Sequence, residues 1–201
     1  MQSVTRAAAM LALLALAACA SAPVALVALP PAAAPASPPG GAGPTILVRE
    51  VVLPGYLDGF PVVVGRRESA LVVAKDTEWA ERPSAGVVRV LRDALSQRLE
   101  PSRVLIEGDR RLPDADLMVE FLALDPRAGA LHLDARWLFV CTAGRASRGG
   151  RTQSDVPMAS ATPAAVATAT SEALARFADV LAHEIPTECR PFTNDAARAR
   201  R

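Results

Sequence analysis

The chain has 201 residues, with 22 lysines and arginines against 21 aspartates and glutamates, and its formal net charge is +1. This balance argues against nucleic acid as a partner, because binding to phosphates needs a concentrated basic face. About 140 residues remain after an N-terminal export signal and a proline-rich stretch, which suits one domain with a substantial core.

Residues 1–18 have the organisation of a bacterial signal peptide. A short basic start is followed by an apolar stretch of about a dozen residues, which is too short to span a membrane by itself. The segment ends in a sequence that resembles the lipobox of bacterial lipoproteins, Leu16-Ala17-Ala18-Cys19. In proteins with this motif the thiol receives a diacylglycerol and the chain is cut before the cysteine. We therefore expect a lipid anchor on Cys19.

The residues around Cys19 also favour a location. Full processing adds more than one acyl chain, and several chains hold a protein at a membrane where one holds it only marginally. Ala20 and Ser21 do not resemble an inner-membrane retention signal, so we expect the outer membrane, with the domain facing the periplasm. An alternative is an uncleaved transmembrane helix over residues 7–29, although Pro23 interrupts that apolar run.

Residues 30–44 are nearly all proline, alanine and glycine. Such a composition neither buries a core nor forms a stable helix, so it predicts a semi-extended tether that continues from the lipidated N-terminus at residue 19. In polyproline form, 15 residues span about 45 Å, which would hold the domain clear of the membrane. We expect one globular domain over residues 45–186, followed by a flexible basic tail over residues 187–201.

The first half of the domain predicts strands, a hairpin and a helix. The expected strands are 45–53, 61–65 and 70–74, the last two joined by a charged turn. Apolar residues recur at helical spacing from Val87 to Leu99. The pattern leaves open whether this helix begins at Glu78 or at Pro83.

The second half predicts further strands and a closing helix. The expected strands are 103–106, 116–125, 130–141 and 150–155. Thr162 and Pro163 are typical of the N-cap and first residue of a helix, which should end before Pro186. The order of elements predicts a mixed α/β (α+β-like) domain, with a largely antiparallel sheet and two helices packed on one of its faces.

The sequence offers no recognisable catalytic or metal-binding pattern. Neither His132 nor His183 stands in a cluster with metal-ligand spacing, and neither a Gly-x-Ser-x-Gly motif nor a phosphate-binding loop occurs. We therefore expect no enzymatic activity, no metal and no cofactor.

Two cysteines remain besides Cys19. Cys141 ends the apolar face of a strand, and Cys189 follows the last helix. In an oxidising compartment such a pair is compatible with one disulfide, which would stabilise the fold by roughly 4 kcal/mol through loop closure. Two free thiols are the alternative.

Several segments, taken in order, resemble a known family. They are Leu53-Pro54-Gly55-Tyr56-Leu57-Asp58, Glu78-Trp79-Ala80-Glu81, Val90-Leu91-Arg92-Asp93-Ala94-Leu95, Ala115-Asp116-Leu117-Met118-Val119-Glu120 and Leu133-Asp134-Ala135-Arg136-Trp137. With the lipobox and the alanine-rich last helix, they resemble the ABC-type transport auxiliary lipoproteins typified by paraquat-inducible protein C, the lipoprotein subunit of a membrane-integrity-associated transporter. The resemblance covers about residues 45–185. Family members usually carry an aromatic strand soon after the lipidated cysteine, whereas residues 25–29 of this chain contain no aromatic residue.

The resemblance implies an accessory, non-enzymatic role. Members of the family are outer-membrane lipoproteins that work with a mammalian-cell-entry (MCE) domain protein, and related systems add an ABC permease and ATPase. These systems move phospholipid or other apolar molecules between membranes, so this protein would dock the periplasmic conduit at the outer membrane. Tyr56, Leu57 and Trp79 are the candidate docking residues, or alternatively they fill the core.

Two other functions stay open at this point. One is a structural lipoprotein of another envelope machine, such as an outer-membrane barrel or a lipopolysaccharide-export assembly. The other is a periplasmic enzyme or small-ligand receptor, for which an enclosed apolar cavity with convergent polar groups would be the evidence.

Overall fold

The computed structural model of the protein describes residues 23–35, 43–100, 103–105, 108–142, 147–185 and 189. Cys19, the lipobox residues Leu16, Ala17 and Ala18, and residues 190–201 of the expected tail lie outside the described residues. Within the described ranges there are two helices, α2 (Pro83–Arg98) and α3 (Pro163–Glu184). Neither of these helices is long and apolar enough to cross a membrane.

A five-stranded sheet forms the larger layer, with the strand order β5-β2-β6-β7-β8. Its strands are β5 (Val104–Leu105), β2 (Ile46–Val52), β6 (Ala115–Arg127), β7 (Ala130–Cys141) and β8 (Ser147–Pro157). β2 runs parallel to β5 and β6, whereas β6, β7 and β8 are antiparallel. Ala128 and Gly129 turn β6 into β7, both with positive φ (47° and 82°), as the tightest hairpins require.

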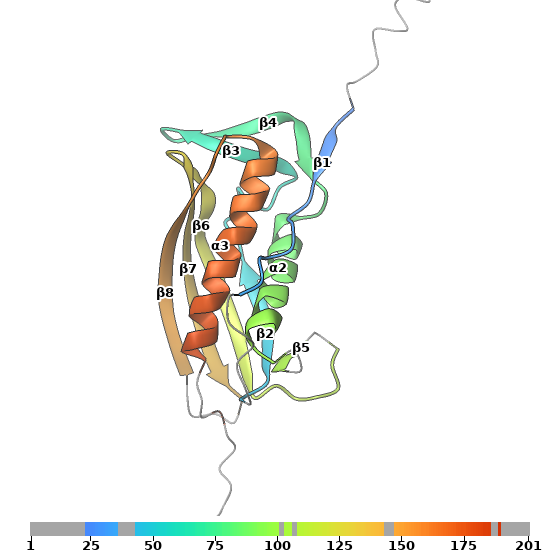
Figure 1. Ribbon diagram of the computed structural model, residues 1–201, viewed down its shortest axis with the longest axis vertical. Helices are drawn as coiled ribbons and strands as arrows, with labels where there is room; N and C mark the ends of the chain where they lie inside the picture. Colours follow the sequence, from blue (N-terminus) through green and yellow to red (C-terminus); the bar gives the residue numbers. More distant parts are fainter. Residues whose placement is uncertain are drawn as a thin grey trace, which may run out of the picture.

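A three-stranded sheet with the order β1-β4-β3 closes one end of the molecule. β3 (Pro61–Arg67) and β4 (Ala70–Trp79) form the expected hairpin, and β1 (Ala25–Val27) runs parallel to the end of β4. Figure 1 shows this sheet across the upper end, above the helices and the long strands.

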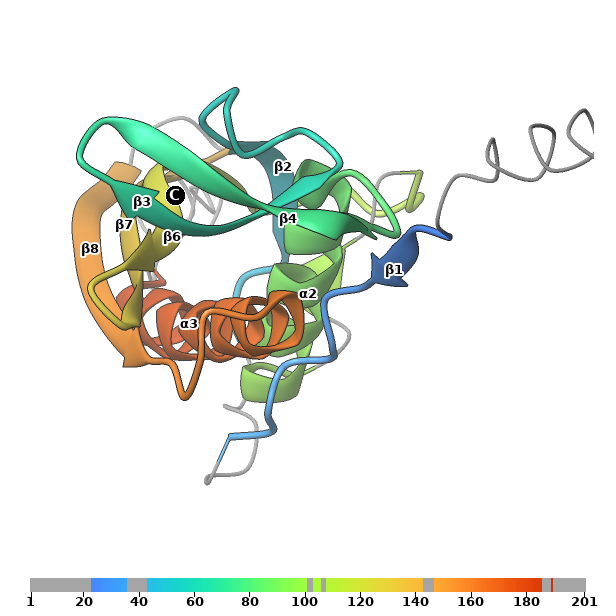
Figure 2. The same ribbon diagram turned by 90° about the horizontal axis from the view of Figure 1, so that it is seen from above.

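The core lies between the larger sheet and the two helices. Alternate residues of β7, including Leu131, Leu133 and Phe139, are fully buried on the helix side, and Phe177 of α3 meets Phe121 of β6 edge to face at 5.8 Å. Figure 2 shows both helices on the same side of β6, β7 and β8. The prediction of a mixed domain with two helices on one face is therefore confirmed, with the detail that the strands divide into two sheets and that β2 pairs in parallel.

The helix starts follow the predicted signals. β4 continues through Glu78 to Trp79, so α2 begins at Pro83 and not at Glu78. The hydroxyl of Thr162 accepts a hydrogen bond from the backbone N–H of Ala165 at 3.3 Å, which caps the first turn of α3.

The N-terminal segment differs from the expectation. Residues 25–27 form β1, so they do not belong to a helix over residues 7–29, and the next residues run along the outer side of the helix pair (Figure 1). The Leu29 side chain is 5% exposed, and its carbonyl accepts a hydrogen bond from Arg89 at 3.1 Å. The Pro30 carbonyl accepts another from the Ser171 hydroxyl at 2.7 Å.

The expected tether over residues 30–44 is therefore wrong for its first part, residues 30–35. Individual side chains of this segment, such as Leu29 and Ala32, are buried without any periodic pattern in the sequence. The surface of the helix pair has room for them. A Cβ atom added to Gly86 of α2 would lie 3.2 Å from a methyl carbon of Leu29, closer than an ordinary contact. The absence of that atom lets the N-terminal segment lie against the helix.

Cys141 and Cys189 are joined by a disulfide, with their Cα atoms 5.4 Å apart. Both are buried beside Ala115, the first residue of β6. The structure therefore has the disulfide and not two free thiols. This bond attaches Cys189 to the last residue of β7, at the lower end of the larger sheet.

We predict that Leu29→Ala lowers the free energy of unfolding by about 2–4 kcal/mol, because it leaves a cavity where a buried leucine packed. Leu26→Ala is the matched control, since Leu26 lies three residues away with 67% of its side chain exposed. The control should change stability by less than about 0.5 kcal/mol in urea denaturation. Equal and negligible effects of the two variants would show that the segment is not packed in solution.

Candidate functional site

The turn over residues 54–59 and the end of β4 bring together the residues that the sequence singled out. The Leu57 N–H donates to the Pro54 carbonyl at 2.8 Å, which closes the turn. The Trp79 N–H donates to the Phe60 carbonyl at 2.7 Å, which places the turn beside the last residue of β4. Candidate docking residues from two distant segments are thus neighbours at the upper end of the molecule.

Leu57 and Trp79 line a small apolar cavity under the three-stranded sheet. Its walls come from the N-terminal segment, the hairpin, both helices and the end of β6, and they include Leu29, Val87 and Leu124. The cavity holds about 30 Å³, room for about one or two water molecules and far below the size of a pocket for a lipid or a small-molecule ligand. Leu57 and Trp79 therefore pack against the core at this end.

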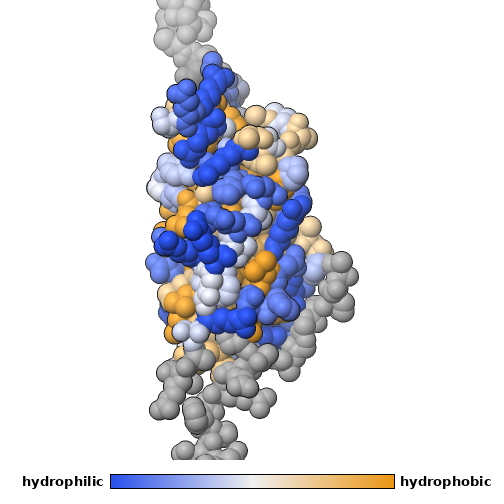
Figure 3. All heavy atoms as spheres, turned by 90° about the vertical axis from the view of Figure 1, so that its left-hand side faces the viewer, coloured by the Kyte–Doolittle hydropathy of each residue, from blue (hydrophilic) through white to orange (hydrophobic). Residues whose placement is uncertain are grey.

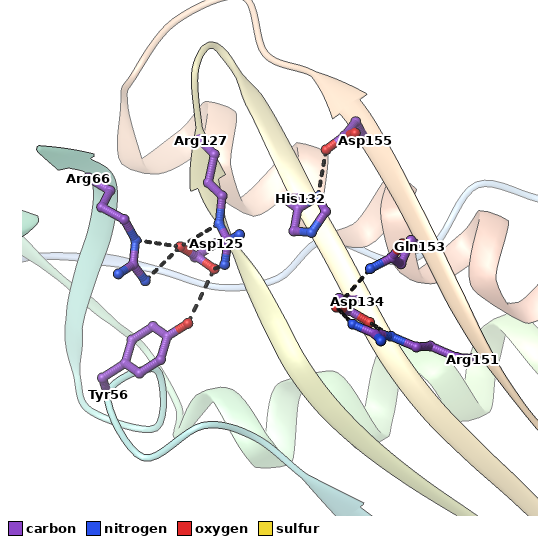
Figure 4. Close-up of polar contacts among 9 residues, drawn as sticks. All are labelled: Tyr56, Arg66, Asp125, Arg127, His132, Asp134, Arg151, Gln153 and Asp155. Carbon is purple, nitrogen blue, oxygen red and sulfur yellow. Dashed lines mark hydrogen bonds and ion pairs between the residues drawn. The ribbon is translucent and has the colours of Figure 1, made fainter. Parts of the chain in front are cut away.

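Tyr56 points into a different environment, a polar cluster centred on the carboxylate of Asp125, which is 0% exposed. The Tyr56 hydroxyl donates to this carboxylate at 3.3 Å, and Arg66 and Arg127 each donate to it at 3.1 Å (Figure 4). The Arg66 guanidinium also lies 5.4 Å from the centre of the Tyr56 ring. Burial and the negative charge of Asp125 raise the pKa of Tyr56, so its hydroxyl stays protonated as the donor.

Asp58, which follows Leu57 in the turn, contacts the start of α2. Its carboxylate accepts a hydrogen bond at 2.9 Å from the backbone N–H of Ser84, one of the first residues of α2. Arg82, the N-cap residue, has no side-chain hydrogen bond of its own to the helix, so Asp58 supplies a partner for an N–H group in the first turn. Tyr56 thus bonds to Asp125 of β6, and Leu57 lines the apolar cavity. Asp58 accepts a hydrogen bond from the start of α2.

The outer face of β7 and β8, away from the helices, carries paired charges. Arg151 makes two parallel hydrogen bonds to Asp134, at 2.8 and 2.6 Å, and Gln153 adds a third at 3.0 Å (Figure 4). These bonds lower the pKa of Asp134 to about 2. His132 contacts Asp155 at 2.8 Å in the same row. Figure 3 shows a mostly hydrophilic surface over this side of the molecule.

The acidic side chains of this region are paired with other side chains. The carboxylates in Figure 4 have arginine, tyrosine, glutamine or histidine partners, and they do not converge on a cavity. Within the described ranges, no three histidine, cysteine or acidic side chains are grouped so as to hold a metal ion.

Sequence reasoning did not identify two exposed apolar side chains at the upper end, Leu26 and Phe60, nor the central role of Asp125. β1 is only three residues long, too short to show alternation, and a single aspartate in a strand carries no local signal. The sequence grouped Tyr56 with Leu57 and Trp79, whereas in the structure Tyr56 contacts Asp125 and the other two line the apolar cavity.

Comparisons with known proteins agree with this fold. The model of a family described as ABC-type transport auxiliary lipoprotein component matches residues 28–182. The crystal structure of an uncharacterized protein superposes with a TM-score of 0.65 and 18% identity, covering 82% of this chain and 100% of the other. The crystal structure of protein XCC0632 from Xanthomonas campestris, of family DUF330, has a TM-score of 0.57 and 18% identity, covering 79% and 91%. No curated protein matches the chain.

We predict that Asp125→Ala lowers the free energy of unfolding by about 1.5–3 kcal/mol, because it removes the buried carboxylate that accepts hydrogen bonds from Tyr56, Arg66 and Arg127. Glu172→Ala is the control, since it removes an exposed pair with Arg176 one helical turn away, worth about 0.5 kcal/mol or less. Urea denaturation measures both. If the two variants lose similar amounts of unfolding free energy, the Asp125 cluster does not stabilise the packing of the β3–β4 hairpin on β6.

The Asp134 pair predicts a pH dependence. Because its pKa is depressed from 3.8 to about 2, its stabilising contribution is present above about pH 4 and is lost as the pH falls toward 2. The difference in unfolding free energy between the wild type and Asp134→Asn should therefore shrink between pH 4 and pH 2. Arg151→Gln should remove the same pH-dependent component. Parallel curves for wild type and Asp134→Asn down to pH 2 would contradict the assignment.

Proposed function

This chain belongs to the family of ABC-type transport auxiliary lipoprotein components, and we propose from that membership that it is an outer-membrane lipoprotein of an MCE-type, ABC-linked transport system. Acyl chains on Cys19 hold it at the membrane, and the domain faces the periplasm. It docks the end of a periplasmic conduit that carries phospholipid or other apolar molecules between membranes. Its contribution is to position the conduit, without catalysis.

The observation that carries the proposal is the combination of two features. The family match extends over residues 28–182, and a lipobox ending at Cys19 stands nine residues before it. Membership in a lipoprotein family and a lipobox cysteine shortly before the matched residues support the same anchored arrangement. The paired carboxylates and the small size of the apolar cavity support a role without chemistry and without a stored ligand.

The docking surface follows from the positions of the candidate residues. Leu57 and Trp79 line the internal cavity, so we assign them the task of fixing the shape of the turn. Tyr56 is exposed beside Arg66 on the outer side of the larger sheet (Figure 4), and we assign it the contact with the MCE partner. An amphipathic aromatic ring next to a cation is a frequent centre of protein interfaces.

The test is an affinity purification of the lipidated protein from envelope membranes that contain the MCE, permease and ATPase proteins of the same cell. Wild type should recover the MCE protein. Tyr56→Ala should recover at least tenfold less, because a central interface residue is removed. Leu112→Ala is the matched control and should recover it fully, since Leu112 is 90% exposed near the start of β6, at the other end of the molecule.

The outcomes separate the two parts of the proposal. Failure of the wild type to recover an MCE protein, under conditions that preserve envelope complexes, contradicts the assigned system. Equal recovery by wild type and Tyr56→Ala contradicts only the docking site.

A further inference from the structure

The upper end of the domain exposes large apolar side chains close to the lipid anchor. Val24 is 51% exposed, Leu26 67% and Phe60 43%. Leu26 of β1 lies opposite Glu78 of β4, which in turn lies opposite Pro61 of β3. Leu26, Glu78 and Pro61 therefore lie in one cross-strand row, and Phe60 directly precedes Pro61 in the chain. We call Val24, Leu26, Phe60 and the adjacent Arg82 the β1 end.

Arg82 lies at this end, with its guanidinium 3.9 Å from the Asp58 carboxylate. Its guanidinium lies 5.7 Å from the centre of the Phe60 ring, and it donates a hydrogen bond to the Asp58 carbonyl at 3.4 Å. Most of the Arg82 side chain is exposed. Segments that lie at a membrane interface combine phenylalanine and leucine side chains with lysine or arginine.

The length of chain before β1 limits how far this end lies from a membrane. Only five residue steps separate Cys19 from Val24, and an extended chain spans at most about 3.6 Å per step. Val24 therefore lies within about 18 Å of an acylated Cys19, because the packing of β1 and residues 28–35 fixes the chain from there on. This distance is roughly two to three times the depth of one headgroup layer, which is about 5–8 Å, and it is too short for a folded domain to lie between the β1 end and the lipids.

We propose that the β1 end rests on the surface of the phospholipid bilayer that holds the acyl chains. Val24, Leu26 and Phe60 contact the boundary between headgroups and acyl chains, and Arg82 pairs with lipid phosphates. The long axis of the domain then stands away from the membrane, with β1 at the bilayer and Cys141–Cys189 at the far end (Figure 1). This inference rests on the proposed lipidation of Cys19.

The test is tryptophan quenching in the full-length lipidated protein, reconstituted in phosphatidylethanolamine and phosphatidylglycerol vesicles with or without brominated phosphatidylcholine. Phe60→Trp and Leu26→Trp each place a reporter at the β1 end, and either one suffices if the other fails to fold. Leu112→Trp is the matched reporter at the opposite end. After subtraction of the wild-type signal, brominated lipid should quench the β1-end reporters at least twice as strongly as the Leu112→Trp reporter.

Flotation of the same vesicles separates the two ways in which the proposal can fail. The lipidated protein should float with the vesicles, and Cys19→Ser should not. Failure of the wild type to float overturns the anchor and this proposal with it. If the protein floats but its reporters are quenched equally, or the β1-end reporters are not quenched, the anchor stands and the orientation is overturned. That last result would assign the β1 end to a protein partner.

Discussion

The architecture depends on the packing of the N-terminal segment against the helix pair. Leu29 fills a space that exists because residue 86 is a glycine, and two carbonyl groups of the segment accept hydrogen bonds from Arg89 of α2 and Ser171 of α3. These contacts make Leu29 and Pro30 part of the domain. With the proposed acylation of Cys19, they would set an upper limit on the distance between the domain and the bilayer, whereas a free tether would leave that distance open.

The upper end of the molecule is organised by one short turn. Within this turn, Tyr56 bonds to Asp125 of β6 and Leu57 lines the apolar cavity. The next residue, Asp58, accepts a hydrogen bond from the first turn of α2. The segment that carries the family resemblance is therefore a structural junction between three elements that are far apart in sequence. It also determines which side chains remain outside: Tyr56 toward the outer face of the larger sheet, and Phe60 with Arg82 beside the end of β4. The proposed protein partner and the proposed lipid surface would thus have separate places at the same end of the domain.

Much of this fold could be predicted from local signals. The alternation along 130–141, the helical spacing after Val87 and the Thr162-Pro163 start each depend on neighbours within a few residues, and each corresponds to an element of the structure. The parallel pairing of β2 with β6 could not be predicted, because it depends on a crossover through α2 and not on the pattern within either strand. The packing of residues 28–35 could not be predicted because a run of proline and alanine has no hydrophobic periodicity. Whether these residues pack on the helices depends on the shape of the helix surface. Tyr56 was identified by type, but its separation from Leu57 and Trp79 depends on the buried carboxylate of Asp125.

The most direct measurement of the central claim is neutron reflectometry of the lipidated protein on a supported phospholipid bilayer. With the N-terminal segment packed on the domain, the protein layer should begin within about 20 Å of the headgroups. A water-filled layer of about 45 Å between headgroups and protein, the length of a free proline-rich tether, would contradict the account.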